Sequence, residues 1–409
     1  MNNQIFKRIA TAFVSVCLFI SGSGVFAETN DIFAVPSNDI NKSGERGNVR
    51  IIVELDDTPL LSYEGKISTY SSISDFLASG EAKGIEQRLE QKRRAVKKAL
   101  GKSGMDFIVK REYSAVMNGL SVEADIDDLN EIKETDGVKD AFVAEFYSLP
   151  KPVNAYSNGG VSAIGGDIVG EKLGLTGKNS AVAILDTGLD LSHPAFSSVN
   201  SPKYSKDDIE NVIKNNKMTI GKLNVSKVYI NDKIPYAYDY ADVDTNVSGG
   251  DSHGTHVAGI VGANGGGVVE GVAPDAQLLI MKVFGDSTGG AYDDDILAAL
   301  DDSVKFGVDS INMSLGSTAG FSESAYKSMR EVYNRVKNSG IALYCAAGNE
   351  YSSSYRNTAG NDLPKATEPD NGTVASPSTY DAALSVASMN NIETTSVYLL
   401  ASGDRKSVV

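Results

Sequence analysis

Short apolar strands alternate with helical segments from Ser180 onward, and this alternation constrains the fold more than any other feature of the chain. Strands of a doubly wound sheet are short apolar runs separated by helices, and both kinds of segment recur here in sequence order. The predicted strands are Ala181 to Leu185, Gln277 to Phe284, Ser310 to Ser314 and Gly340 to Ala347, and the predicted helices are His253 to Gly262, Asp293 to Phe306 and Ser322 to Asn338. The sequence therefore predicts an α/β domain with a parallel sheet.

The carboxyl ends of these strands carry the polar residues from which a site could be built. In open α/β sheets, ligands bind beyond the carboxyl ends of the strands. The residues found there are Asp186, Ser287, Gly316 and Asn349.

A smaller unit is predicted ahead of this sheet, over residues 49–150. Its strands are expected at Val49 to Glu54, Val116 to Glu123 and Val138 to Phe146, and its helices at Gly84 to Leu100 and Ile126 to Glu134. This β-α-β-α-β order predicts a small α+β domain of ferredoxin-like type. The basic run in the first helix is expected to be a solvated face, and the Gly-, Ser- and Asn-rich stretch from Asn154 to Gly166 is expected to be an exposed hinge.

The first 27 residues have the pattern of a secretory signal peptide, with a basic start, an apolar run from Ile9 to Ile20 and small residues before Glu28. The apolar run is shorter than the roughly 20 residues that a membrane span needs, so a secreted protein without a membrane span is predicted, with a polar linker over residues 28–48. Cys345 is the one cysteine after the signal, so stability must come from a core rather than an internal disulfide. Asp and Glu number 53 against 38 Lys and Arg, which disfavours nucleic-acid binding.

Two histidines, His253 and His256, lie three residues apart at the start of a predicted helix. Zinc hydrolases place such histidines four apart with a glutamate between them, so a metal site is disfavoured. Asp186 ends a strand and is suited to orient a histidine and stabilise its protonated form, although it could also simply cap a turn. His253 is the candidate general base, and His256 is expected to face the apolar side of the helix with Ile260.

Several motifs together resemble the subtilisin-like serine proteases. They are AVAILDTGLDLSHPAF, SHGTHVAGIVGA, GVAPDAQLLIMKVF, SINMSLGS and CAAGNE, in this order within residues 178–390. The long insert between Asp186 and His253 is similar to the cell-envelope branch that includes the lactocepins and the C5a peptidases. The resemblance implies a secreted serine endopeptidase that hydrolyses peptide bonds. It implies a catalytic domain over 178–409 with the subtilisin-like parallel sheet, an inhibitory propeptide over 49–150, and a processing hinge with the mature N-terminal segment over 151–177.

The resemblance also assigns roles to single residues. Asp186 becomes the orienting acid, His253 the general base and Asn349 the donor to the developing oxyanion. Ser314, Leu315 and Gly316, beside Gly290, become the backbone edge for an extended protein or peptide substrate, and the propeptide tail is expected to lie there as an intramolecular inhibitor. No cofactor is assigned. Members of the family often bind calcium after the histidine helix, but the corresponding loop here, NGGGVVEG, has few oxygen ligands.

The nucleophilic serine is the missing member, and two segments only imitate it. Residues 285–289, GDSTG, fit the nucleophile elbow of the α/β-hydrolases, but that fold needs a histidine after the serine and none follows His256. Residues 372–377, GTVASP, echo the Gly-Thr-Ser motif of the subtilisin-like family, with Val374 at the serine position. We therefore expect that the catalytic serine is not in this chain, that the catalytic domain is truncated at its C-terminus, and that the chain alone is inactive.

This expectation leaves two alternatives for the function of the chain. The chain is either the precursor of a secreted endopeptidase or a secreted, catalytically inactive relative that binds peptides or a partner protein. Any cell-wall anchor would lie in a further C-terminal region.

Overall fold

The computed structural model describes residues 47–149, 160–249, 251–265, 269–317, 327–349, 374–388, 398–401 and 404–407. The predicted signal peptide lies outside the described residues, as do residues 28–46 of the predicted linker and residues 154–159 of the predicted hinge. Within the described part of the chain, no helix has the length and apolar character needed to cross a bilayer.

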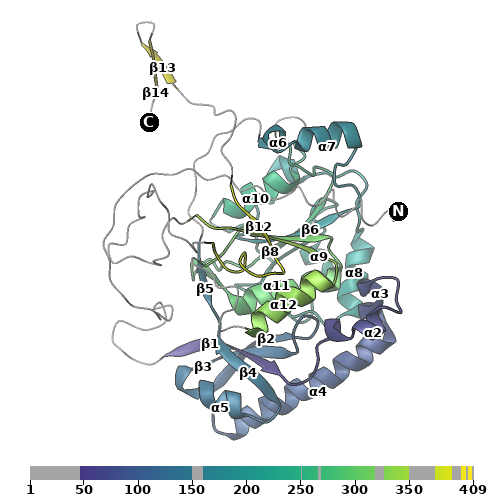
Figure 1. The fold of residues 1–409 in the computed structure, drawn as a ribbon, viewed down its shortest axis with the longest axis vertical. Coiled ribbons are helices and arrows are strands. Elements are labelled where there is room, and N and C mark those ends of the chain that lie inside the picture. Colours follow the sequence, from purple (N-terminus) through teal and green to yellow (C-terminus); the bar gives the residue numbers. More distant parts are fainter. Residues whose placement is uncertain are drawn as a thin grey trace.

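A six-stranded parallel sheet organises the larger unit, as the alternation of strands and helices predicts (Figure 1). Its strand order is β12-β11-β10-β6-β8-β7, and each neighbouring pair is parallel. The strands are β6 (Ala181–Asp186), β7 (Tyr236–Asp239), β8 (Gln277–Lys282), β10 (Ser310–Met313), β11 (Ala342–Ala346) and β12 (Leu384–Val386). The strand β7 was not predicted, because its tyrosines and acids lie in the long insert and resemble a polar loop.

The central strand β6 has alternating residues that belong to different sides of the sheet. Ala181, Ala183 and Leu185 join a core that includes residues of α11 (Asp293–Phe306) and α12 (Lys327–Asn338). Val182 and Ile184 join a second core with α10 (His253–Gly262). Since neighbouring side chains of a strand point to opposite faces, α10 covers one face of the sheet, and α11 and α12 cover the other.

The smaller N-terminal unit has four antiparallel strands in the order β2-β3-β1-β4. They are β1 (Asn48–Leu55), β2 (Phe107–Tyr113), β3 (Gly119–Asp125) and β4 (Val138–Val143), with helices α4 (Gly80–Lys102) and α5 (Leu129–Glu134). The predicted β-α-β-α-β order was therefore wrong by one strand. The missing strand β2 reads FIVKREY, and its charged residues hide the alternation because only Arg111 and Tyr113 are fully buried in it.

The long helix α4 packs on this small sheet through the predicted apolar face. Ile85, Leu89, Val96 and Leu100 are all buried. The expectation that the whole basic run of this helix is solvated was wrong for Arg93, which is buried and bonds Glu86, Glu112, Asn118 and the carbonyl of Tyr113.

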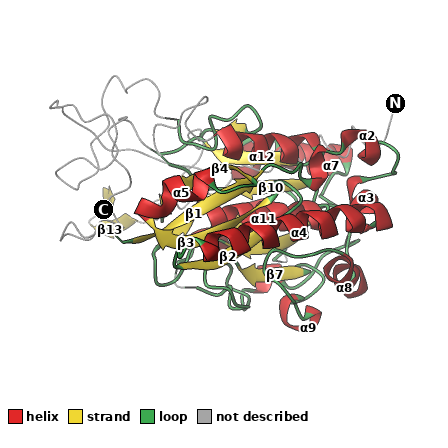
Figure 2. Ribbon diagram, turned by 90° about the horizontal axis from the view of Figure 1, so that it is seen from below, coloured by secondary structure: helices red, strands yellow, loops and turns green. Residues whose placement is uncertain are grey.

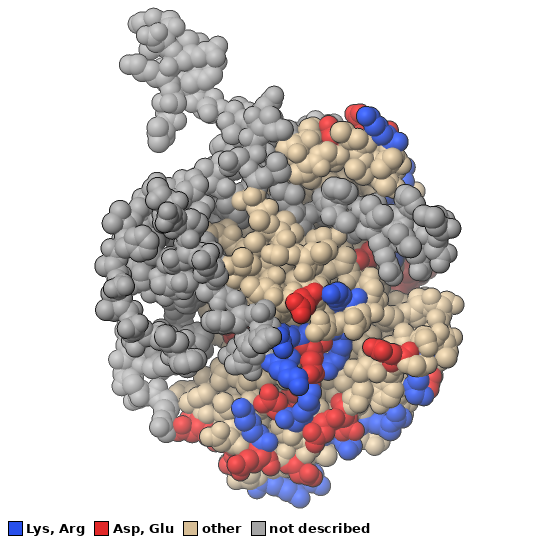
Figure 3. All heavy atoms as spheres, in the orientation of Figure 1, with Lys and Arg blue, Asp and Glu red and all other residues tan. Residues whose placement is uncertain are grey.

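The two units lie directly against each other, with the β2 strand and α11 in contact (Figure 2). Residues of both units share one hydrophobic core, for example Ile52 and Tyr113 with Leu297 and Val304. On the face shown in Figure 3, the charged side chains gather over the lower part, where Figure 1 places α4 and α5 of the N-terminal unit. The two units are therefore joined through apolar surface as well as through the polar contacts described below.

The remaining elements include two separate two-stranded sheets, β5 with β9 and β13 with β14. The remaining α-helices and strands are α2 (Glu64–Ile67), α3 (Ile73–Ala78), β5 (Phe146–Ser148), α6 (Gly160–Ala163), α7 (Gly166–Leu173), α8 (Lys206–Asn215), α9 (Val225–Val228), β9 (Gly290–Tyr292), β13 (Tyr398–Ala401) and β14 (Asp404–Ser407). The described part of the predicted hinge is helical at α6 and at the first residue of α7, and its role as a hinge stays a prediction.

Candidate active site

Asp186 and His253 meet at the carboxyl edge of the parallel sheet. Asp186 is the last residue of β6 and is 1% exposed, and His253 is the first residue of α10. The Asp186 Oδ1 lies 2.7 Å from the His253 Nδ1, a hydrogen-bond distance. Two residues that are 67 positions apart in the sequence are thereby paired in the geometry expected for an acid that orients a general base.

The first turn of α10 is held against the turn that follows β6. The Gly254 N–H donates to the Thr187 Oγ1 at 2.8 Å, and the His253 N–H donates to the Asp251 Oδ1 at 2.7 Å. A Cβ on Gly254 would lie 2.3 Å from the Gly188 carbonyl oxygen, so only glycine permits this close approach. The His253 ring is positioned by these backbone contacts as well as by Asp186.

The surroundings of His253 favour its protonated form. Burial lowers the pKa of His253, but the hydrogen bond to Asp186 and the charges of Asp186 and Asp251 outweigh it, so the pKa is raised above its ordinary value. The Asp186 Oδ2 is buried and has no hydrogen-bond partner among the described residues. The negative charge of Asp186 is therefore directed chiefly at the imidazole and at the Thr187 N–H, which bonds Oδ1.

His256 does not lie where the sequence analysis expected it. It is exposed rather than packed on the apolar side of α10, where Val257, Ala258 and Val261 are buried instead. The helix therefore presents its apolar stripe one residue later than the prediction assumed.

The other predicted site residues follow neighbouring strands at the same edge of the sheet. Ser314 and Leu315 are buried directly after β10, and the Ser314 Oγ accepts a hydrogen bond from Asn312 Nδ2 at 3.0 Å. A Cβ on Gly316 would lie 2.7 Å from the Ala375 Cβ. Asn349 comes three residues after β11 and is exposed.

Ser287 and Ser376, which the sequence predicts not to be the nucleophile, both lie in the part of the chain that the structure describes. Ser287 is exposed in the turn between β8 and β9. Ser376 is buried and forms a two-way backbone bridge with Ser317, at 2.9 and 3.0 Å. In the described part of the chain, no serine hydroxyl forms a hydrogen bond with His253, so the structure leaves the nucleophile unassigned.

The end of the N-terminal unit adds a strand to the larger unit at this edge. The strand β5 pairs antiparallel with β9, with Phe146 opposite Tyr292 and Ser148 opposite Gly290. The Phe146 ring covers Gly290 so closely that a Cβ there would lie 2.1 Å from its Cζ. Gly290 was predicted to belong to the substrate edge, and in the structure an extended segment of the same chain lies on it.

A buried polar interface that no sequence pattern predicted joins the N-terminal unit to the start of α11. The Arg50 Nη1 bonds Asp294 at 2.9 Å and Asp295 at 2.5 Å, and the Arg111 Nη2 bonds Asp295 at 2.5 Å. The Tyr147 hydroxyl donates to Asp293 at 2.9 Å. Three consecutive aspartates at the start of a helix are a common N-terminal signal, so nothing in the sequence marked them as an interface.

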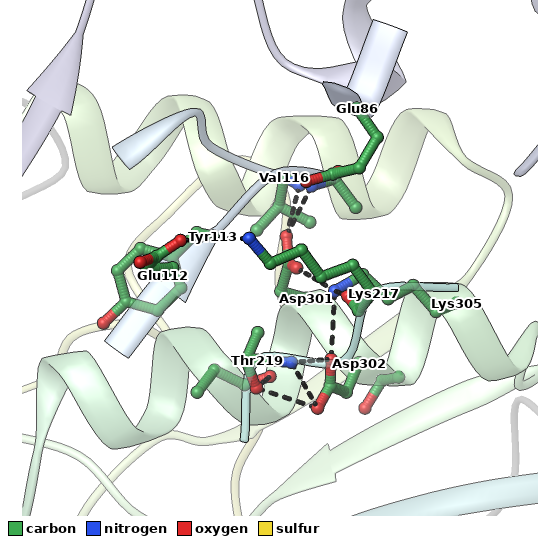
Figure 4. A network of polar contacts seen from close by, with 12 residues as sticks. Glu86, Glu112, Tyr113, Val116, Lys217, Thr219, Asp301, Asp302 and Lys305 are labelled. Atoms are coloured by element: carbon green, nitrogen blue, oxygen red, sulfur yellow. Dashed lines mark hydrogen bonds and ion pairs between the residues drawn. The ribbon is translucent and has the colours of Figure 1, made fainter. Parts of the chain in front are cut away.

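The same interface continues about two helical turns further along α11, at Asp301, whose contacts Figure 4 shows. The Asp301 Oδ1 accepts the backbone N–H groups of Ala115 and Val116, both at 2.8 Å. The Lys305 Nζ lies between Asp301 and Asp302, at 2.7 and 3.1 Å. These contacts fix the loop between β2 and β3 on the helix.

Comparisons with a family profile and with known proteins relate this chain to the same protease family. A sequence profile described as the subtilase family matches residues 177–407. The PIII-type proteinase of Lactococcus lactis subsp. cremoris (strain SK11) is 34% identical over 296 residues, which are 69% of this chain and 14% of that protein. The C5a peptidase of Streptococcus pyogenes serotype M3 (strain MGAS315) is 32% identical over 227 residues, 53% of this chain and 18% of that protein. The chain thus matches only a small part of the length of these relatives.

Among solved structures, fervidolysin from Fervidobacterium pennivorans, a keratinolytic enzyme related to subtilisin, aligns with a TM-score of 0.47 at 17% identity. The alignment covers 96% of this chain and 48% of fervidolysin.

Proposed function

This chain belongs to the subtilase family of serine proteases, and from that premise we propose that it is the precursor form of a secreted endopeptidase with Asp186 and His253 in its catalytic machinery. The observation that carries the proposal is the hydrogen bond between the Asp186 carboxylate and His253 Nδ1 at 2.7 Å. The signal-like N-terminus supports an extracellular location, and the family supports protein or peptide substrates.

In the proposed reaction, His253 takes the proton from the serine nucleophile as it attacks the scissile carbonyl, and later gives it to the leaving amine. Asp186 holds the ring with Nδ1 protonated and Nε2 free to accept, and its charge stabilises the imidazolium. Asn349 donates its side-chain amide to the oxyanion. One such donor contributes about 3 kcal/mol of transition-state stabilisation, a value measured in subtilisin, a member of this family.

The substrate is proposed to bind as an extended strand along Gly290 on one side and along Ser314, Leu315 and Gly316 on the other. An added strand gains affinity through main-chain hydrogen bonds. The pairing of β5 with β9 supports this arrangement, because β5 already has the extended conformation and the antiparallel direction of such a strand.

The N-terminal unit, residues 49–150, is proposed to be an inhibitory propeptide, followed by a processing hinge over 151–177 and the catalytic domain from 178. Two observations support this role: β5 lies on Gly290, at the edge on which a substrate would bind, and the contacts with α11 hold the unit in that position. The processing cut is expected between about Phe146 and Gly166. N-terminal sequencing of the secreted protein tests it, and a mature start at Glu28 with the unit retained would contradict it.

A fluorophosphonate probe tests the catalytic proposal, since it labels only a serine activated by its base. We expect the natural secreted protein to be labelled, and the label to be lost on His253→Ala. Peptide mass spectrometry then identifies the serine, and a label on Ser287 or Ser376 would contradict the expectation that neither is the nucleophile. A protein that binds peptides but never reacts would instead support the inactive relative. Among the described residues, no serine hydroxyl bonds His253. The inactive relative is therefore the second candidate function that this experiment tests.

A further inference from the structure

Lys282 is a buried cation at the edge of the sheet that carries Asp186. It is the last residue of β8, and its side chain is 1% exposed. In the strand register it lies opposite Asp186 on one neighbouring strand and opposite Asp239 on the other. The proposed catalytic mechanism gives Lys282 no role, although a buried ammonium is costly unless it is paired.

The Lys282 ammonium joins three carboxylates from different segments. Its Nζ lies 2.5 Å from Asp239 at the end of β7, 3.3 Å from Asp242 in the following turn, and 3.0 Å from Asp286 in the loop between β8 and β9. One oxygen from each of these carboxylates lies within 4.8 Å of the others, a grouping that could hold a metal ion. In this chain the position among them is taken by the lysine.

The network around the ammonium is closed by backbone contacts. The Asp286 N–H donates to the Asp242 Oδ2 at 2.8 Å, and the Asp242 N–H donates to the Asp239 Oδ1 at 2.9 Å. Burial lowers the pKa of Lys282, but its hydrogen bonds and charge pairing with Asp239 and Asp286 outweigh this and raise the pKa. The side chain therefore stays charged at neutral pH and ties the turn after β7 to the loop that leads into β9.

The aliphatic part of Lys282 supports the segments that carry the Asp186 and His253 pair. A Cβ on Gly188, two residues after Asp186, would lie 3.1 Å from the Lys282 Cδ. A Cβ on Gly249, four residues before His253, would lie 2.8 Å from the Lys282 Cε. Both glycines therefore rest directly on the lysine side chain, and a shift of that side chain would move the chain on both sides of the pair.

We propose that Lys282 is a positioning residue for the Asp186 and His253 pair, and that its ammonium serves as a built-in cation where three carboxylates would otherwise require a metal ion. This inference rests on the proposed function in one respect, that Asp186 and His253 are catalytic residues. Without the ammonium, the carboxylates of Asp239, Asp242 and Asp286 repel one another. The turn after β7 and the loop before β9 then separate, and the support under Gly188 and Gly249 is lost.

The test is a histidine NMR titration of the full chain carrying Lys282→Met, which keeps an unbranched side chain as far as the ε position and removes the ammonium. With three histidines in the chain, selective ¹⁵N labelling gives few signals, and His253→Gln assigns one of them. In the unaltered chain we expect a low-field Nδ1 proton for His253 and a pKa above its ordinary value, because the hydrogen bond and charge of Asp186 and the charge of Asp251 outweigh burial. In Lys282→Met the low-field proton should broaden or disappear. Loss of the ammonium charge by itself would raise the pKa of His253, so a pKa that instead falls toward its ordinary value reports the loss of the Asp186 contact.

Lys305→Met is the matched control, because Lys305 is also a buried lysine held by carboxylates, Asp301 and Asp302 (Figure 4). It lies on α11. Its atoms are not among those nearest to Gly188 or Gly249, whereas Lys282 atoms are. We expect this variant to lose thermal stability while the His253 titration stays unchanged. An equal change of the His253 titration in both variants would mean that the loss of any buried lysine charge alters His253. That result would overturn the proposal.

Calcium provides the second arm. The three carboxylates left in Lys282→Met offer oxygen ligands of the kind that calcium prefers, so calcium at about 10 mM, above the Kd of weak extracellular sites, should restore the His253 signal. The unaltered chain should not respond. A folded Lys282→Met with an unchanged His253 titration would overturn the positioning role, and a titration that calcium does not restore would overturn the built-in cation.

If Lys282→Met does not fold, Asp286→Asn replaces it, because the Asp286 side chain is 49% exposed and its loss is tolerable. Loss of this negative charge lowers the pKa of His253 by itself, so the low-field Nδ1 proton is the readout in this variant. That signal should broaden, though less than in Lys282→Met, and an unchanged signal would overturn the proposal. Failure of the proposed function is seen separately, as a fluorophosphonate label that survives His253→Ala, whatever the NMR result.

Discussion

Arg111→Met should weaken the attachment of the N-terminal unit far more than the loss of an exposed charge on that unit. The Arg111 side chain is 3% exposed and bonds both the Asp295 carboxylate and the backbone carbonyl of Tyr240. Removing one partner of a buried ion pair costs about 3–5 kcal/mol, because the other charge stays buried. Arg50 still pairs with Asp295 in the variant, so we expect the lower value of about 3 kcal/mol at pH 8. That is a factor of about 150 in the dissociation constant.

The cost should depend on pH, because burial and the charge of Asp294 raise the pKa of Asp295 to about 7 in the attached state. A free Asp295 at an exposed helix start would titrate near 4. Between these values the attached state holds a proton that the free state lacks, so attachment is favoured at low pH and weakens as the pH rises through 7. At pH 5 the variant leaves a neutral carboxyl, and the cost should fall to about 1 kcal/mol, that of an ordinary hydrogen bond.

The assay uses the full chain with a site-specific protease sequence placed within residues 151–158. After cutting, the dissociation constant of the N-terminal unit is measured at pH 5 and pH 8. Arg94→Met is the control, since the Arg94 side chain is 70% exposed and pairs with Glu90 on its own helix, which is worth about 0.5 kcal/mol or less. Equal dissociation constants for Arg111→Met and Arg94→Met at pH 8 would refute the reasoning.

Three further outcomes are expected. Asp186→Asn should lower the pKa of His253 below its value in the unaltered chain, as followed by NMR titration, and an unchanged pKa would show that Asp186 does not set it. Burial and the charge of Glu145 raise the pKa of Asp293 to about 8, so in the unaltered, cut chain the affinity of the N-terminal unit should fall as the pH rises from about 4 to 8. Asp293→Asn should reduce that slope, and an identical slope in both proteins would contradict the assignment. Gly254→Ala should cost about 1–3 kcal/mol in chemical denaturation because its Cβ meets the Gly188 carbonyl, whereas Gly259→Ala in the same helix, where a Cβ meets nothing within 4 Å, should stabilise by about 0.5–1 kcal/mol. The reverse order would show that the close approach at Gly254 is not tight.

The strands and helices that bury a continuous apolar run could be predicted from the sequence. The helix α11 has the predicted bounds, and α4 buries the predicted Ile85, Leu89, Val96 and Leu100. Among the missed strands, β2 and β7 are rich in charged or hydroxyl-bearing side chains, and those that are buried have partners on other segments, as Asp239 of β7 has in Lys282 of β8. Arg111 is an example, since its charge is buried against Asp295 from another part of the chain.

The sequence by itself determined that a strand ends in Asp186 and that a helix begins at His253, because the apolar period of 2 or 3.6 residues and the following glycines are local properties. Only the tertiary structure decided that these two side chains meet at 2.7 Å, that His256 points to solvent, and that Lys282 lies among three carboxylates. These facts depend on the order of strands in the sheet and on which helix covers which face. Contacts between residues far apart in the chain are set by packing, and no local pattern encodes them.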